Sequence, residues 1–188
     1  MVCSLNSEAS VVLDACVLAP MPLCDTLLRC AEEYALFRPL WSAETLVEVR
    51  RDLKKFGCSA SQIERRMEFM QNAFPEACIH LSAILLEAVP EIPDSGDRHV
   101  VAVAIQAKAQ AIVTFNLRHF PRVALEPFGI TVYSPDKFLM GLFGRNPDEI
   151  VNVLDQQAKA IGQSRESVLE RLKAGLPEFV VLASERQG

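Results

Sequence analysis

The amino-acid sequence predicts an α/β fold in which short buried strands alternate with helices. The strongest indication is the stretch 94–121, where a run rich in Ala and Val, too apolar for a surface helix, is followed by the β-branched run 111–114. Polar residues stand where this helix begins and where this strand ends. Because ligands in open α/β sheets collect at the carboxyl ends of parallel strands, these residues lie where a site is expected.

The composition fits one domain with a substantial core. The chain has 188 residues, of which 50% are apolar and 23% charged. The formal net charge of -5 argues against binding of nucleic acid by bulk attraction. It leaves room for a nucleic-acid enzyme, because carboxylates that hold divalent cations make a site acidic until the metal binds.

The cysteines and the N-terminus predict a reduced, cytoplasmic protein. The six cysteines form no Cys-x-x-Cys pair, so packed free thiols are expected in preference to a metal site or disulfides. The first residues lack the basic region and apolar run of a signal peptide, and no stretch approaches about 18 uninterrupted apolar residues. No membrane partner is therefore expected.

The first expected strand covers residues 10–13 and ends at Asp14. A carboxylate directly after a buried strand is costly unless it caps a helix, pairs or binds a cation, and both capping and cation binding remain open for Asp14. A helix is expected over 25–34 and a second strand over 36–41, in which Pro39 indicates an edge strand.

The next expected helix runs from Ser42, as its N-cap, to Lys55 and stops at Gly57. Glu48 lies on this helix at a position that could face the strand ends, although an ordinary solvated pair with Arg51 is the alternative. Arg50 and Arg51 belong to the densest basic cluster of the chain. Basic residues beside a carboxylate site would suit a phosphodiester substrate.

Asp94 and Asp97 open the central helix. Their spacing resembles a capping box, in which both acids accept hydrogen bonds from the free N–H groups at the helix start. This role is compatible with cation binding. The remaining elements are expected as helices over 59–72, 84–87, 137–143, 147–161 and 164–175 and as strands over 78–81 and 128–133. The helices after Asn146 carry no visible chemistry and are expected to pack on the domain or on a partner.

Four separate elements deliver oxygen-bearing side chains to one predicted sheet edge. These side chains are Asp14, Glu48, Asp97 and Asn116. Hard cations such as Mg²⁺ and Mn²⁺ take several oxygen ligands, so this arrangement predicts a divalent metal site. The matching chemistry is metal-assisted hydrolysis of a phosphodiester.

Five short motifs occur in a characteristic order and spacing: VVLDACVL (11–18), WSAETLVEVRR (41–51), GDRHVVAVAI (96–105), IVTFNLRHFP (112–121) and SPDKFL (134–139). In these motifs the chain resembles the PIN-domain family of metal-dependent ribonucleases, close to the VapC-type toxins of bacterial toxin-antitoxin modules. The resemblance implies a three-layer α/β/α fold with a short central parallel sheet over 9–144. A C-terminal helical extension over 145–188 resembles the tail found in one branch of the family.

The resemblance also implies a site and its partners. Asp14, Glu48 and Asp97 are expected as the core catalytic and metal-binding acids, with Asp94 as a further metal ligand and Asn116 as a further catalytic group. The expected substrate-binding residues are Ser42, Arg50, Arg51, Thr114 and His119. The expected cofactor is Mg²⁺ or Mn²⁺, the substrate RNA, and the partners a cognate antitoxin and a second copy of the chain.

One departure from the family pattern bears on catalysis. Relatives place a fourth acid after the strand that ends at Thr114, at the position of either Asn116 or His119, and this chain has an acid at neither. Asn116 brings an oxygen without charge, and His119 prefers a transition metal to Mg²⁺. The alternative to a ribonuclease is therefore a catalytically weak PIN-like module that binds RNA or protein.

Overall fold

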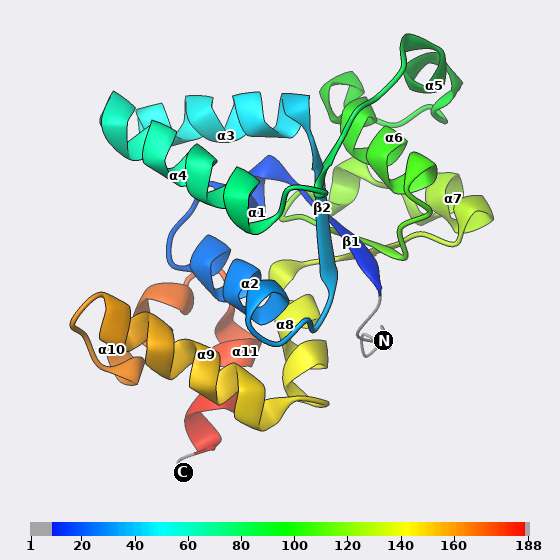
Figure 1. Ribbon diagram of the computed structural model, residues 1–188. Helices are drawn as coiled ribbons and strands as arrows, with labels where there is room; N and C mark the ends of the chain where they lie inside the picture. Colours follow the sequence, from blue (N-terminus) through cyan, green and yellow to red (C-terminus); the bar gives the residue numbers. More distant parts are fainter. Residues whose placement is uncertain (1–8, 187–188) are drawn as a thin grey trace.

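The computed structural model of the chain describes residues 9–186 and shows a parallel sheet between two layers of helices (Figure 1). The five strands lie in the order β3-β2-β1-β4-β5, and all neighbouring pairs are parallel. Their bounds are β1 Ser10–Leu13, β2 Arg38–Ser42, β3 Cys78–Ile79, β4 Ala111–Val113 and β5 Thr131–Tyr133. The predicted α/β fold class is confirmed.

Alternation along the central strands divides the apolar residues between the two faces of the sheet. Val11 and Leu13 of β1 belong to one buried cluster, whereas Val12 belongs to the other. Successive side chains of a strand point to opposite faces, so a strand covered on both sides needs an unbroken apolar run. The sequence of β1 and β4 supplies such runs.

The two helical layers differ in size (Figure 1). One face of the sheet packs against α1 (Ala15–Leu18), α2 (Leu23–Glu32), α3 (Ala43–Lys55), α4 (Ala60–Ala73) and the C-terminal helices. The other face packs against α5 (Ala83–Ala88), α6 (Arg98–Gln106) and α7 (Arg122–Leu125). α3 and α6 therefore lie on opposite faces and approach the site from different sides.

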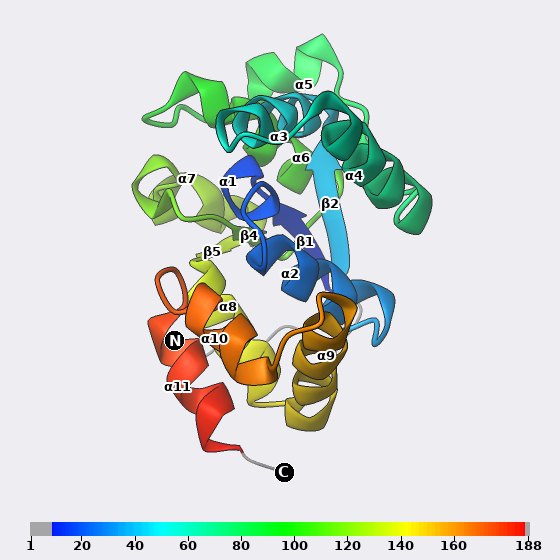
Figure 2. The ribbon, with the colours of Figure 1, turned by 90° about the vertical axis from the view of Figure 1, so that its left-hand side faces the viewer.

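The C-terminal helices are α8 (Pro135–Phe143), α9 (Pro147–Ala160), α10 (Arg165–Leu172) and α11 (Pro177–Glu185), gathered below the sheet in Figure 2. Leu154 of α9 and Phe179 of α11 are fully buried in the same cluster as β1. Gln157 of α9 is buried and accepts a 2.8 Å hydrogen bond from Thr26 Oγ1 of α2. The tail thus shares its core with the sheet.

The last helix differs from the prediction, which ended helical structure at Gly175. A proline shortly after a helix often marks its end, but Pro177 is the first residue of α11, a position that proline also favours. The cap of α11 comes from α8, where Asp136 accepts hydrogen bonds from the backbone N–H groups of Glu178 and Phe179. A cap supplied from a distant helix leaves no local signal.

The prediction of an edge strand from Pro39 was wrong, because β2 pairs with β1 on one side and β3 on the other. The Arg38 N–H donates to Ala9 O of the chain leading into β1, so the nitrogen of Pro39 faces the β3 side. On that side the ladder starts only where Trp41 N donates to Ala77 O. Pro39 therefore precedes the pairing that its missing N–H would have disrupted.

Two further observations concern the described residues. Cys16, Cys24, Cys30, Cys58 and Cys78 are free thiols, and Cys3 lies outside the described part of the chain. Between residues 9 and 186, no helix combines the length and the apolar character that crossing a bilayer would require.

Candidate metal centre

Asp14 stands directly after β1, where its buried carboxylate is held by two neighbours. Thr114 Oγ1 donates to Asp14 Oδ2 at 2.6 Å, and Cys16 Sγ donates to the same oxygen at 3.1 Å. The parallel pairing of Leu13 with Val113 places Asp14 and Thr114 side by side at the strand ends. Among the described residues, Asp14 gives no side-chain cap to α1, so capping does not explain its burial.

The loop after β4 is fixed to the same group of residues. The Asn116 N–H donates to Thr114 Oγ1 at 2.9 Å, and the Phe115 N–H donates to Cys16 Sγ at 3.2 Å. Burial, together with the charge of Asp14, raises the pKa of the Cys16 thiol to about 12. The thiol is therefore protonated at neutral pH and can donate to Asp14.

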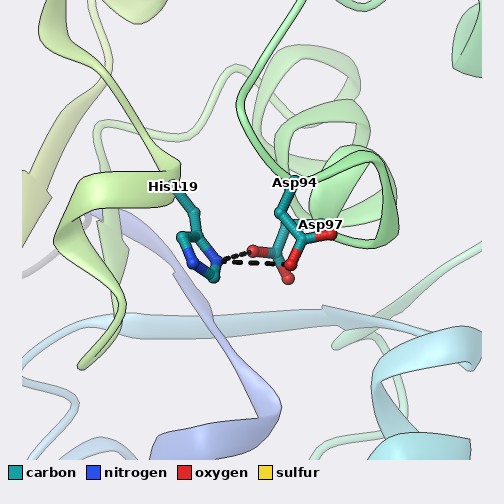
Figure 3. Close-up of side chains that lie close together, drawn as sticks. All are labelled: Asp94, Asp97 and His119. Carbon is teal, nitrogen blue, oxygen red and sulfur yellow. Dashed lines mark hydrogen bonds and ion pairs between the residues drawn. The ribbon is translucent and has the colours of Figure 1, made fainter.

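Asp94, Asp97 and His119 form the second part of the site (Figure 3). His119 Nδ1 lies 2.7 Å from Asp97 Oδ2 and 3.6 Å from Asp94 Oδ2. The other Asp94 oxygen, Oδ1, accepts from the Gly96 N–H and closes the short 3₁₀ turn Ser95–Asp97. In the described structure Asp97 occupies the N-cap position of α6 without a side-chain cap bond, so its carboxylate faces His119 instead of the helix.

The electrostatics of Asp97 indicate a site that favours a cation. Burial raises the pKa of Asp97, the hydrogen bond to His119 lowers it, and the charges of Asp14 and Asp94 raise it further, with a net increase. Negative charges crowded in a half-buried site disfavour one another, and a bound cation would offset this repulsion. Asp14 is thus close enough for its charge to raise the pKa of Asp97.

The donor set fits a divalent metal ion. One ligand atom each from Asp94, Asp97 and His119 lie within 4.8 Å of one another, and within the described residues this is the group of His, Cys, Asp and Glu side chains that could hold an ion. Two carboxylates and an imidazole suit Mn²⁺ and other first-row transition metals better than an all-oxygen set would. Asp14 and Glu48 lie outside this group.

Glu48 lies on α3, on the opposite face of the sheet from α6, and is 26% exposed. Its Oε2 lies 3.6 Å from Nε2 of His99, which follows Asp97 by two residues on α6. Ser42 is fully buried, caps α3 by accepting from the Thr45 N–H at 2.9 Å, and lies 2.8 Å from His99 Nδ1. Glu48 of α3 is therefore in contact with α6, the helix that begins directly after Asp97.

Comparison with known proteins assigns this chain to a family. The sequence profile described as "PIN domain" matches residues 8–118, which is more than half of the chain and includes Asp14, Glu48, Asp94 and Asp97. The chain belongs to the PIN domain family. The match ends at Arg118, one residue before His119.

A curated relative extends this comparison over a short segment. The PIN-domain chain is 52% identical over 44 residues to a protein named putative ribonuclease VapC50 from Mycobacterium tuberculosis. The aligned segment covers 23% of this chain and 26% of that protein. No solved structure matches the chain.

The two arginines expected to bind substrate lie on α3 of this PIN domain, each beside an acid. Arg50 pairs with Glu64 of α4, and Arg51 Nε lies 3.6 Å from Asp52 Oδ1. The Arg51 side chain is 61% exposed and its pair with a sequence neighbour is weak. Arg51 is therefore freer than Arg50 to turn toward a ligand.

The structure adds two residues that sequence reasoning did not assign to the site of this PIN domain. Cys16 contacts Asp14, and His99 contacts Glu48 and Ser42. The sequence held a signal for each of them. Cys16 comes two residues after the candidate acid Asp14, and His99 is a polar residue inside an Ala/Val-rich helix, where a buried histidine needs hydrogen-bond partners.

Proposed function

We propose that this PIN-domain protein is a divalent-metal-dependent endoribonuclease that hydrolyses phosphodiester bonds of RNA. The observation that carries the proposal is the convergence of Asp94, Asp97 and His119 beside the buried Asp14 at the carboxyl ends of β1 and β4. Family membership and the similarity to a protein named as a putative ribonuclease support it.

In this proposal Asp97, Asp94 and His119 hold the cation, and Asp14 and Glu48 complete its surroundings. A bound Mg²⁺ or Mn²⁺ supplies Lewis-acid stabilisation of the scissile phosphate and an activated water. Thr114 and Cys16 orient Asp14 by donating to its Oδ2, which leaves Oδ1 without either of these donors. Asn116 offers an uncharged carbonyl oxygen at the end of β4.

The substrate contacts in this proposal come from exposed groups. Arg51 and Arg50 on α3 approach RNA phosphates, with Arg51 the more accessible of the two. Ser42 and Thr114 are fully buried and hydrogen-bonded, so their contribution to binding is indirect, through His99 and Asp14. His119 acts as a metal ligand at the edge that RNA would approach.

The proposed biological role is that of a toxin in a toxin-antitoxin module. The segment similar to the protein named VapC50 supports this role. A cognate antitoxin protein would block the site in the cytoplasm, and a second copy of the chain is a further proposed partner. We also propose that residues 9–144 form the nuclease domain and that the extension 145–188 folds with it, since both contribute to one buried cluster.

A second candidate is a catalytically weak PIN-like module that binds RNA or protein. The observation that favours it is the 2.7 Å contact between His119 and Asp97, which occupies a carboxylate oxygen at a position where relatives would supply another acid. A cation must displace His119 from Asp97 before it can bind that oxygen, so the His119–Asp97 contact lowers the apparent affinity for a cation. In this second candidate the contact persists and the protein binds metal weakly.

The experiment that separates the two candidates is cleavage of a mixed RNA pool by purified protein. Mg²⁺, Mn²⁺ and a chelator are compared, with Asp14→Asn as the matched control for the loss of one carboxylate charge. Metal-dependent cleavage that disappears in the control supports the ribonuclease. A folded protein that binds RNA without cutting it in either metal supports the binding module.

The identity of residue 119 gives a sharper prediction. Because the imidazole favours Mn²⁺ over Mg²⁺, the wild-type protein is expected to work better with Mn²⁺, and His119→Asp is expected to raise both Mg²⁺ affinity and activity in Mg²⁺. Titration calorimetry and the cleavage assay measure the two effects. Unchanged values for both would remove position 119 from the site.

A further inference from the structure

His99 is a buried histidine with one satisfied and one unsatisfied ring nitrogen. It is 6% exposed on α6, and its Nδ1 lies 2.8 Å from Ser42 Oγ and 3.4 Å from Thr45 Oγ1. Within the described residues Nε2 has no hydrogen-bond partner. The carboxylate oxygen Oε2 of Glu48 lies 3.6 Å from it. An unpaired buried nitrogen beside a carboxylate calls for an explanation.

The hydroxyl groups around Nδ1 indicate where the ring hydrogen lies. Ser42 Oγ accepts from the Thr45 N–H, and its own O–H can donate to Nδ1 of His99 at 2.8 Å or to Thr45 Oγ1 at 3.0 Å. If Nδ1 accepts, the neutral ring carries its hydrogen on Nε2. The opposite tautomer would turn a bare nitrogen lone pair toward the Glu48 carboxylate. The arrangement therefore favours an Nε2–H group directed at Glu48.

We propose that His99 is a positioning residue that holds the Glu48 carboxylate at the candidate metal centre through its Nε2–H group. Ser42 and Thr45, which form the cap of α3, lie against the ring on its other side, so His99 connects this cap to the Glu48 carboxylate. The importance of Glu48 to the reaction rests on the proposed ribonuclease function, but the contact with His99 does not.

A contact with His99 would restrict the conformations of the Glu48 side chain. This side chain is long and 26% exposed, and it loses rotamer freedom when its carboxylate is held in one place. A buried ring locked by Ser42 provides a fixed partner. Since His99 follows Asp97 on α6, the contact also fixes Glu48 of α3 relative to Asp97. Partners that orient metal-binding carboxylates commonly change metal affinity by about 10- to 100-fold when removed.

The first test needs no metal. Long-range ¹H–¹⁵N correlations of the histidine rings in metal-free protein report the tautomer of each ring. We expect His99 as the Nε2–H tautomer, with an Nε2 resonance that moves in Glu48→Ala while the resonances of the exposed His80 stay in place. The Nδ1–H tautomer, or an Nε2 resonance indifferent to Glu48→Ala, would overturn the proposal.

The second test is a double-mutant cycle in Mn²⁺ affinity measured by titration calorimetry. His99→Leu is expected to weaken binding about tenfold, His99→Gln to recover most of the loss because its amide can donate near the Nε2 position, and His80→Leu to have no effect. In a Glu48→Ala background, His99→Leu should cost nothing more.

A purely structural role of His99 would give the same loss in both backgrounds, and that result would overturn the proposal. A wild-type protein that binds no Mn²⁺ would contradict the proposed function instead. The ring correlations would then still decide whether His99 and Glu48 are in contact.

Discussion

Replacing Thr114 with valine tests the support of Asp14 most cleanly. The substitution keeps the β-branched shape at a fully buried position and removes only the hydroxyl that donates to Asp14 Oδ2 at 2.6 Å. A hydrogen bond to a charged group is worth about 1.5–3 kcal/mol. The hydroxyl also accepts from the Asn116 N–H, which would lose its partner. We expect the free energy of unfolding of metal-free protein to fall by about 2–3 kcal/mol.

Urea unfolding measures this loss, and a thermal scan should show a decrease in Tm of about 4–12 °C for a chain of this length. Thr131→Val on the neighbouring strand β5 is the matched control, because that threonine is exposed and its substitution should change stability by less than about 0.5 kcal/mol. If Thr114→Val is as stable as the control, the hydroxyl does not support the carboxylate and the reasoning fails.

Two further predictions concern charge and the tail. The pKa of Asp97 is raised mainly by burial, so the unfolded state loses this proton first and stability falls as pH rises through the ordinary carboxyl value of 3.8. In urea unfolding, metal-free Asp97→Asn should therefore be more stable than wild type at pH 7 and equal to it at pH 3. Excess Mn²⁺ should make wild type the more stable protein at pH 7. If metal-free Asp97→Asn is less stable than wild type at pH 7, the account is contradicted. Phe179→Ala, at a fully buried position of α11, should lower the stability of the whole chain by about 3–5 kcal/mol in a single transition, whereas the exposed Val181→Ala should not. A separate early transition would mean that the tail unfolds independently.

The sequence could predict the central sheet because buried parallel strands leave a direct signal. The runs that form β1 and β4 are apolar on both faces, and polar residues follow directly after each run, at Asp14 and Thr114. Residues that follow adjacent parallel strands must lie close together. The sequence thus predicts which residues end each strand, whereas the pairing of β1 with β4 that makes them neighbours is seen in the structure.

Contacts between distant elements could not be predicted in the same way. Asp136 caps α11 across more than forty residues, and no local pattern marks an acid in one helix as the cap of another. The same is true of His99, whose partners Ser42 and Glu48 lie on α3. The direction of Asp97 is a related case, since capping and facing His119 are both compatible with its place in the sequence.

The central claim is that Asp97, with Asp94 and His119, holds a divalent cation at the carboxyl edge of the sheet. Crystals grown with MnCl₂ test it directly, because the anomalous scattering of Mn²⁺ locates the ion without reference to activity. The account predicts one anomalous peak in contact with Asp97 and with Asp94 or His119, and its loss in Asp97→Asn. An empty cluster in a protein that still cleaves RNA with Mn²⁺, or a peak bound by other residues, would contradict it.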